Sequence, residues 1–130
     1  MPPMNKVVLD ASAVLALLND EVGAKIVQEC LPGAIISSVN FGEVVTRLAL
    51  LGMPDNEIRE TLNILALDIF PFDEEQSFLA GFLAIKTKPF GLSLGDRACL
   101  ALALKTGSEA LTSDKVWQTL EIGADVRVIR

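Results

Sequence analysis

Short apolar runs alternate along this chain with longer segments whose apolar positions recur at helical spacing. The short runs predict a buried strand at 6–9 and further strands at 34–36, 68–70, 110–111 and 126–129. The longer segments predict helices at 11–18, 21–30, 39–51, 54–65, 73–86 and 93–105, with a short helical turn at 114–120. Strands that alternate with helices usually form parallel sheets. We therefore expect an α/β fold with a central parallel sheet of four to five strands, flanked by helices on both faces.

Turn and capping residues indicate where several of these elements end. Pro32-Gly33 separates the second helix from the second strand. Ser37 and Ser38 are suitable N-caps for the helix that follows them, as is Ser93 for the helix through 105. Gly107 fits the left-handed position that ends a helix. Because we find no internal repeat or linker, we treat residues 1–130 as a single domain.

The composition supports a folded domain. The chain has 130 residues, of which 51% are hydrophobic. A chain of this length can bury a core without disulfides or a structural metal. The apolar share indicates a dense core together with a surface reserved for a partner. Cys30 and Cys99 fall within apolar helical patterns, which indicates buried, reduced thiols and a cytoplasmic protein.

Neither a membrane span nor a targeting signal is expected. Charged residues, glycine or proline interrupt each apolar stretch before about 18 residues, the length that a membrane helix needs. The start of the chain, Met1 to Lys6, lacks a long apolar segment and a small-residue cleavage site. We therefore expect no signal peptide there.

Charge and the absence of histidine narrow the chemistry. The net charge is −6, which argues against a broad basic surface for nucleic acid, so any such activity must depend on a local site. Without histidine, Ser-His-Asp and Cys-His catalysis and histidine-based zinc sites are excluded. Ionisable chemistry near neutral pH is left to carboxylates and to what they bind.

Four acids are expected at one edge of the predicted sheet. Ligands of parallel sheets bind at the carboxyl ends of the strands. There Asp10 ends the first strand and Asp114 follows the 110–111 strand, while Glu43 and Asp96 lie in the first turns of two helices. Four clustered carboxylates resist ionisation, and a divalent cation removes that conflict. Oxygen ligands favour Mg²⁺ or Mn²⁺, which can activate water against a phosphodiester.

Helix capping is the competing interpretation of these acids. Asp10 and Asp114 stand where N-caps are found, and Ser93 to Asp96 fits the Ser-x-x-Asp capping box. Glu43 is compatible with a solvated helix surface. Taken singly, each acid fits a structural role at least as well as a catalytic one, and their joint placement at one edge favours a site.

Four segments carry a family resemblance: Val7 to Ala13, Ser37 to Val44, Leu92 to Ala103 and Leu111 to Trp117. In order and spacing they resemble the four motifs of PIN domains, and they are most similar to the VapC-type toxins of bacterial toxin–antitoxin pairs. Each segment alone is a weak signal, whereas four in order across nearly the whole chain are specific.

The resemblance implies a PIN-like fold and a Mg²⁺- or Mn²⁺-dependent endoribonuclease, usually a homodimer, that an antitoxin protein holds inactive. It implies that the catalytic, metal-binding acids are Asp10, Glu43, Asp96 and Asp114. It also implies three pocket-lining hydroxyl residues, Ser12, Thr112 and Ser113. The RNA target stays open, and tRNA is a class that fits the resemblance.

Other residues have two interpretations each. Lys86, Lys88 and Lys115 are candidates for contacts to the RNA backbone and fit a solvated surface equally well. Arg97 is a further candidate for RNA contact, although a structural salt bridge or a helix-surface role is favoured for it. Trp117 is expected to pack, and phenylalanines are expected in the core or at a partner surface at 41, 78, 82 and 90.

Three alternative functions can be weighed against the sequence. A response-regulator receiver requires paired acids after the first strand, where this chain has only Asp10, and an acid after its third strand, whereas Asp68 precedes it. A haloacid-dehalogenase-type phosphatase requires Asp-x-Asp, where this chain has Asp10-Ala11-Ser12. A catalytically silent PIN-like scaffold or interaction module suits the apolar content but not the intact acids. For a partner helix, we expect groove walls at 11–18, 21–31 and 39–51.

Overall fold

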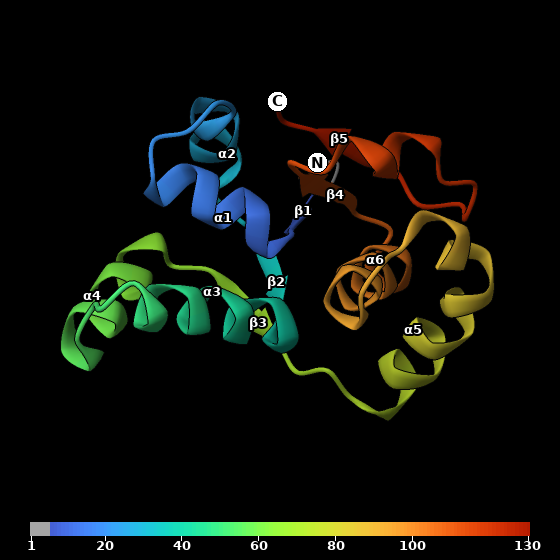
Figure 1. The fold of residues 1–130 in the computed structure, drawn as a ribbon, viewed down its shortest axis with the longest axis horizontal. Coiled ribbons are helices and arrows are strands. Elements are labelled where there is room, and N and C mark those ends of the chain that lie inside the picture. The colour runs from blue at the N-terminus through green and yellow to red at the C-terminus, as the bar shows by residue number, and fades with distance from the viewer. Residues whose placement is uncertain (1–5) are drawn as a thin grey trace, which may run out of the picture.

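Five short strands form one sheet in the computed structural model, which describes residues 6–130 (Figure 1). They are β1 (Val7–Leu9), β2 (Ile35–Ser37), β3 (Asp68–Phe70), β4 (Glu109–Thr112) and β5 (Val126–Val128). All neighbouring strands are parallel, in the order β3-β2-β1-β4-β5. The predicted parallel sheet is confirmed, with each strand at or beside its predicted position.

Helices connect these strands in the predicted order. Within residues 6–130 they are α1 (Ala11–Leu18), α2 (Ala24–Cys30), α3 (Ser38–Leu50), α4 (Asp55–Leu65), α5 (Glu74–Thr87) and α6 (Leu94–Thr106). Two 3₁₀ turns are η1 (Lys88–Phe90) and η2 (Lys115–Thr119). The turn predicted at 114–120 is therefore present as η2.

Local capping explains several helix ends. Ser37 begins α3, because its side chain accepts a hydrogen bond from Val39 N at 3.2 Å. Asp73 begins α5 in the same way, accepting from Gln76 N at 2.9 Å. Gly107 ends α6 with a φ of 65°, a left-handed conformation that glycine adopts without strain. The caps predicted at Ser37 and Gly107 are confirmed.

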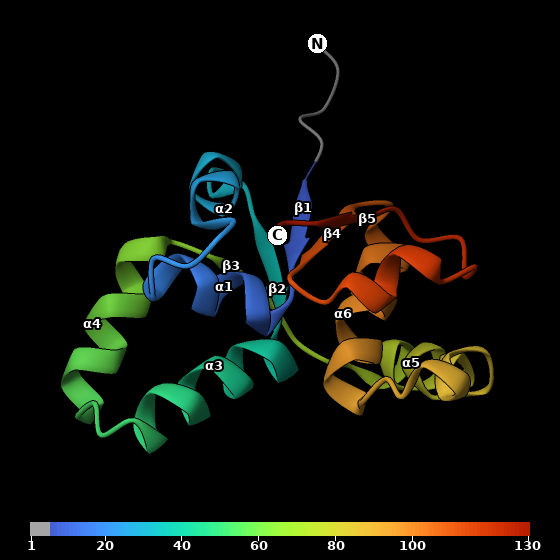
Figure 2. The ribbon, with the colours of Figure 1, turned by 45° about the horizontal axis from the view of Figure 1, so that its top comes forward.

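Alternate residues of β1 face opposite layers of helices. Val7 and Leu9 join a core with α1, α2, α3 and α4, whereas Val8 joins a second core with α5 and α6. Trp117 is buried in the second core, as predicted. Figure 2 shows the sheet between these two groups of helices. The prediction of helices on both faces is confirmed.

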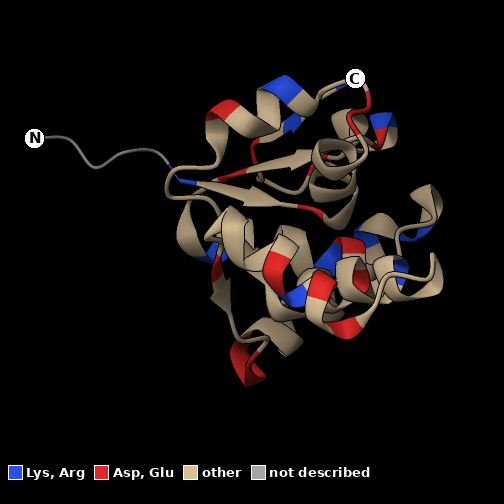
Figure 3. Ribbon diagram, turned by 90° about the vertical axis from the view of Figure 1, so that its left-hand side faces the viewer, with Lys and Arg blue, Asp and Glu red and all other residues tan. Residues whose placement is uncertain are grey.

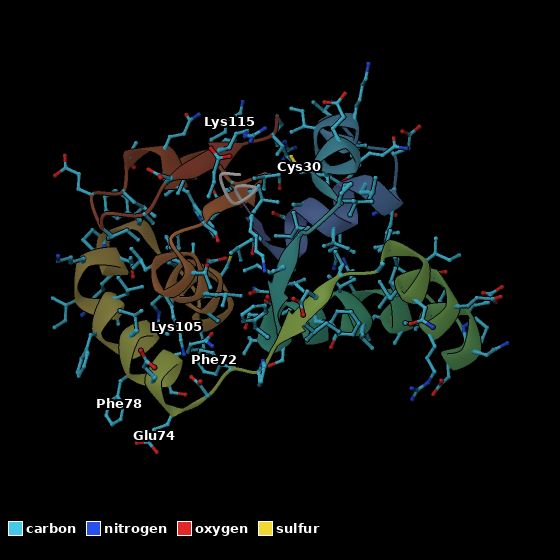
Figure 4. The ribbon with its side chains drawn as sticks, turned by 180° about the vertical axis from the view of Figure 1, so that it is seen from behind. Cys30, Phe72, Glu74, Phe78, Lys105 and Lys115 are labelled. Carbon is cyan, nitrogen blue, oxygen red and sulfur yellow. The ribbon has the colours of Figure 1, made fainter. Side chains whose placement is uncertain are left out.

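The layer of α5 and α6 combines an ion-pair network with an exposed apolar strip. Lys105 of α6 forms ion pairs with Asp73 at 3.4 Å and Glu75 at 3.2 Å, and Figure 4 shows Lys105 beside the start of α5. On the outer side of α5, Phe78 projects from the molecule and stacks on Phe82 with ring centroids 6.1 Å apart. These rings are 58% and 69% exposed, so they do not belong to the core.

The second helix begins later than predicted. α2 starts at Ala24 and not at residue 21, because Gly23 has a φ of 96°. A Cβ on Gly23 would lie 2.5 Å from the carbonyl oxygen of Ile129, so a long-range contact requires glycine here. Cys30 is only half-buried, which corrects the expectation of a buried thiol at that position, whereas Cys99 is buried.

Acidic and basic residues are interspersed over the helices (Figure 3). No helix within residues 6–130 is long and apolar enough to cross a membrane. The segment Met1–Asn5, which contains most of the stretch where no signal peptide was expected, lies outside the described residues.

Candidate active site

The sheet has one switch point: β2 and then β3 are added on one side of β1, and β4 and then β5 are added on the opposite side. β1 lies between β2 and β4, and the sheet continues to β3 on one side and to β5 on the other. Ligands of parallel sheets bind beyond the carboxyl ends of the strands at such a point. Asp10 directly follows β1, and its backbone N–H donates to the carbonyl of Leu111 in β4 at 2.9 Å. Asp10 therefore stands at the switch point.

Two hydroxyl groups hold the carboxylate of Asp10. Asp10 Oδ2 accepts hydrogen bonds from Ser12 Oγ at 2.7 Å and from Thr112 Oγ1 at 3.0 Å. The backbone N–H groups of Ser113 and Asp114 donate to those hydroxyls, at 3.0 Å and 3.1 Å. Because an ionised carboxylate can only accept, each hydroxyl donates its proton to Asp10 and uses a lone pair to accept from the loop after β4. Ser12 and Thr112 thus lie beside Asp10, whereas Ser113 contributes its backbone N–H.

The surroundings of Asp10 make its carboxylate difficult to ionise. Only 6% of the residue is exposed, and this burial raises the pKa of Asp10 from 3.8 to about 6. Hydrogen bonds from Ser12 and Thr112 lower that pKa, while the negative charges of Asp96 and Glu43 raise it. The structure therefore places these three acids within one electrostatic environment, in which a cation would be favourable.

Glu43 lies on α3, and its carboxylate is turned toward α6. Its Oε1 accepts a hydrogen bond from Asn40 Nδ2 at 2.9 Å. A Cβ on Gly95, in the first turn of α6, would lie 2.5 Å from Glu43 Oε2. Glu43 is exposed, but its carboxylate lies against a second helix, which distinguishes it from a freely solvated helix residue.

Capping accounts for two of the acids and not for Asp10. Asp96 forms the predicted capping box: Asp96 Oδ2 accepts from Ser93 N at 2.9 Å, and Ser93 Oγ accepts from Asp96 N at 3.2 Å. Asp114 caps η2 by accepting from Val116 N at 3.0 Å. Asp10 occupies the N-cap position of α1, but its side chain makes no capping hydrogen bond. Capping therefore leaves the position of Asp10 unexplained.

Each of the four acids uses only one oxygen for hydrogen bonds within residues 6–130. The acceptors are Asp10 Oδ2, Glu43 Oε1, Asp96 Oδ2 and Asp114 Oδ1. With these side-chain rotamers, no three acids or cysteines in the described part of the chain are close enough to hold a metal ion. The hard oxygen donors and the shared negative field fit Mg²⁺ or Mn²⁺.

The buried thiol near these acids is unsuited to nucleophilic chemistry. Cys99 is fully buried, and burial raises its pKa well above the usual range. The negative charges of Asp10, Asp96 and Glu43 raise that pKa as well. Because the thiolate is the reactive form, Cys99 is a packing residue.

The cationic residues differ in how they are held. Arg97 is half-buried, and its Nη1 donates to the carbonyl of Ala80 in α5 at 2.9 Å, which supports the structural interpretation. Lys86, Lys88 and Lys115 are exposed, and none of them forms an ion pair within residues 6–130. These three lysines remain available for a ligand.

Sequence reasoning missed three residues next to Glu43. Asn40 precedes Glu43 by three positions, and this helical spacing was the signal that identifies it. Gly95 has no local signal, because its proximity to Glu43 arises from the packing of α3 on α6. Arg47 lies one turn after Glu43, and with it lines an open hollow of about 510 Å³.

A larger hollow, of about 620 Å³, lies between α3 and α4. Apolar side chains line much of it, among them Phe41, Val45, Met53, Ile58 and Leu62. This hollow is formed by α3 and α4, and neither α1 nor α2 lines it. The partner groove expected at 11–18, 21–31 and 39–51 stays a prediction.

The fold is that of a small α/β protein with a five-stranded parallel sheet, and a buried acid, Asp10, stands at its switch point. The chain belongs to the PIN domain family, whose model matches residues 7–122. The resemblance inferred from the four motifs is confirmed. Proteins of this family are in general nucleases. A comparison with curated proteins finds no match.

Solved structures with this fold include several toxin–antitoxin proteins. A toxin–antitoxin complex from Klebsiella pneumoniae is 20% identical, with a TM-score of 0.76 over 95% of this chain and 98% of that one. VapBC2 from Rickettsia felis, bound to a promoter DNA fragment, is 15% identical, with a TM-score of 0.74 over 95% and 98%. VapC20 from Mycobacterium tuberculosis, described as a toxin that cleaves the sarcin–ricin loop, is 17% identical, with a TM-score of 0.72 over 91% and 98%. At these identities the likeness establishes the fold.

Proposed function

We propose that this chain is a Mg²⁺- or Mn²⁺-dependent endoribonuclease that acts as the toxin of a type II toxin–antitoxin pair. The observation that carries the proposal is the buried carboxylate of Asp10, held by two hydroxyl groups at the switch point within the field of Asp96 and Glu43. Membership of the PIN family supports it, because nucleases of that family generally depend on a divalent metal.

The residues that would hold the metal are Asp10, Glu43, Asp96 and Asp114, through the oxygen that each leaves free of hydrogen bonds. A divalent cation, when bound, supplies an activated water and neutralises charge on the phosphodiester. Ser12 and Thr112 fix Asp10 through Oδ2, so Oδ1 is the oxygen that remains for the ion. The positive N-terminal end of α6, beside Asp96, favours an anionic phosphate nearby.

A few local cations would complete the RNA site, since the net charge of −6 provides no general attraction for RNA. Lys115 directly follows Asp114, and Lys86 and Lys88 stand shortly before α6. Arg47 lies in the hollow that Glu43 also lines. Arg97 is a weaker candidate, because the carbonyl of Ala80 already binds it.

An antitoxin is the proposed protein partner. The apolar hollow between α3 and α4 is a suitable surface for a partner segment, and the Klebsiella structure of the same fold is a toxin–antitoxin complex. The homodimer is likewise part of the proposal. Light scattering at micromolar concentration tests it, and a monomer would contradict that part alone.

Metal-dependent RNA cleavage by the purified chain tests the function. We expect cleavage of total RNA with Mn²⁺, none with EDTA, and a loss of cleavage in folded Asp96→Asn. Asp68→Asn is the matched control, because Asp68 is an exposed acid on β3, outside the site, and should retain activity. Full activity in Asp96→Asn would overturn the role of Asp96. A folded parent protein without metal-dependent cleavage would favour the scaffold function instead.

A further inference from the structure

Asn40 is fully buried and connects α3 to α6. Its Nδ2 donates one hydrogen bond to Glu43 Oε1 and another to the carbonyl oxygen of Gly95, both at 2.9 Å. Both partners are acceptors only, so the amide nitrogen must face them and the oxygen must face away. Asn40 Oδ1 is buried with no hydrogen-bond partner within residues 6–130. An unsatisfied buried oxygen is costly, which indicates that the two bonds of the nitrogen are important.

Gly95 forms the other side of the same contact. A Cβ at this position would lie 2.5 Å from Oε2 and 2.6 Å from Oε1 of Glu43. Because these atoms are the end of a flexible side chain, a larger residue at 95 would displace the carboxylate and leave the backbone in place. Without these contacts, the exposed Glu43 side chain would occupy several rotamers.

We propose that Asn40 and Gly95 are positioning residues, which hold the Glu43 carboxylate in place for a divalent cation. The inference rests on the proposed function, because it takes Glu43 as a metal ligand. Asn40 occupies Oε1 and leaves Oε2 as the ligand oxygen. Gly95 lets the carboxylate lie against the first turn of α6, the turn that carries Asp96. Partners of this kind typically change metal affinity by about 10–100-fold.

A purely structural role makes a different prediction from a positioning role. If Asn40 only joined α3 to α6, its loss would lower the melting temperature without metal and leave metal affinity unchanged. Positioning predicts weaker metal binding even in a variant whose metal-free stability is kept. Gly95→Ala is such a variant, because the three atoms nearest to its new Cβ all belong to the Glu43 carboxylate group.

Calorimetric titration of Mn²⁺ into the full chain separates these roles. We compare the parent with Asn40→Ala, Gly95→Ala and Glu43→Gln. Gly81→Ala on α5 is the matched control, because its added Cβ meets no atom within 4 Å. We expect the Kd for Mn²⁺ to rise about 10-fold or more in Asn40→Ala and Gly95→Ala. Gly81→Ala should bind Mn²⁺ like the parent, and Gly95→Ala should melt near the parent without metal.

The possible results distinguish this inference from the proposed function. Parent-like Mn²⁺ affinity in folded Gly95→Ala, with weakened binding in Glu43→Gln, would overturn the positioning role and leave the metal site intact. A parent that binds no Mn²⁺ would overturn both. If Asn40→Ala does not fold, Gly95→Ala decides the question, because it keeps Asn40 and its hydrogen bond to the carbonyl oxygen of residue 95.

Discussion

The two halves of the acid cluster are built in different ways. On the β1–β4 side, Asp10 is buried, makes no capping hydrogen bond and accepts from two hydroxyls. On the helical side, Asp96 and Asp114 cap the turns that carry them, and Glu43 lies at the surface against α6. Local helix chemistry thus explains the placement of Asp96 and Asp114, whereas Asp10 is held by Ser12 nearby and by Thr112 from a distant part of the chain.

This difference shows which acid the fold stabilises least. A capping carboxylate stabilises its helix in the charged form. A buried carboxylate beside two other acids is costly to ionise, and only a ligand or a proton relieves that cost. The fold therefore opposes the charge of Asp10, which is consistent with the cation site proposed above.

Replacing Asp10 should have the largest effect on activity. Asp10→Asn keeps an oxygen that can accept from Ser12 and Thr112 but removes the charge. We expect RNA cleavage with Mn²⁺ to fall at least about 100-fold, because even the outer-shell partners of a metal typically contribute 10–100-fold. Initial rates measure it, with Asp125→Asn as an exposed control. Activity in Asp10→Asn close to the parent would place the metal elsewhere.

The same residue should make stability depend on pH. Folding raises the pKa of Asp10 from 3.8 to about 6, so the folded state binds the carboxyl proton more tightly than the unfolded state does. Its contribution to stability is therefore fully present below pH 3.8 and is lost as pH rises through about 6. The loss amounts to about 3 kcal/mol in the unfolding free energy.

Urea unfolding of the metal-free protein, at several pH values from 4 to 7, tests this dependence. Asp10→Asn should lack this contribution and should be more stable than the parent at pH 7. A parallel pH dependence in both proteins would show that Asp10 is not the group responsible.

Removing the hydroxyl of Thr112 should lower the stability of the protein, because this hydroxyl holds Asp10. Thr112→Val deprives Asp10 of one donor and the Asp114 N–H of its acceptor. We expect a loss of about 1–3 kcal/mol in the unfolding free energy, the cost of leaving a buried polar group unsatisfied. The loss should be larger at pH 7 than at pH 4, because the lost hydrogen bond stabilises the ionised acid. Equal stability of Thr112→Val and the exposed control Thr119→Val would show that the hydroxyl network contributes little.

The smallest effect on stability is expected on the helical side. Asp96→Asn weakens the capping box at the start of α6, and we expect a loss of about 1 kcal/mol or less. This loss of stability is opposite in sign to the gain in stability that we expect for Asp10→Asn at neutral pH. Thermal unfolding of the two metal-free variants measures the contrast, and an increase in stability for both would show that the two halves do not differ.

The sequence predicted what short-range chemistry determines. The strands, the capping box of Ser93 and Asp96 and the end of α6 at Gly107 follow from neighbouring residues, and the structure confirms them. The fold class followed from the alternation of strands and helices. The four acids were predicted from the expected strand edge, and the shared field of Asp10, Glu43 and Asp96 is consistent with that hypothesis.

Long-range packing could not be predicted in the same way. The late start of α2, at Ala24, depends on the close approach of Gly23 to Ile129, which is distant in sequence. The contact between Glu43 and Gly95 depends on how α3 packs on α6. The hollow between α3 and α4 depends on the path of α4, whose buried residues Ile58 and Leu62 reveal its amphipathic face but not its position.

The most direct test of the account is the melting temperature of the parent and of Asp10→Asn at pH 7, with and without Mn²⁺. Without metal, Asp10→Asn should melt at the higher temperature, because it lacks the buried charge. With increasing Mn²⁺, the parent should rise in melting temperature by mass action on the folded state, while Asp10→Asn should not. The difference in melting temperature between the two proteins therefore shrinks or changes sign as Mn²⁺ is added. No rise in the parent at millimolar Mn²⁺, or an equal rise in both proteins, would contradict a metal site centred on Asp10.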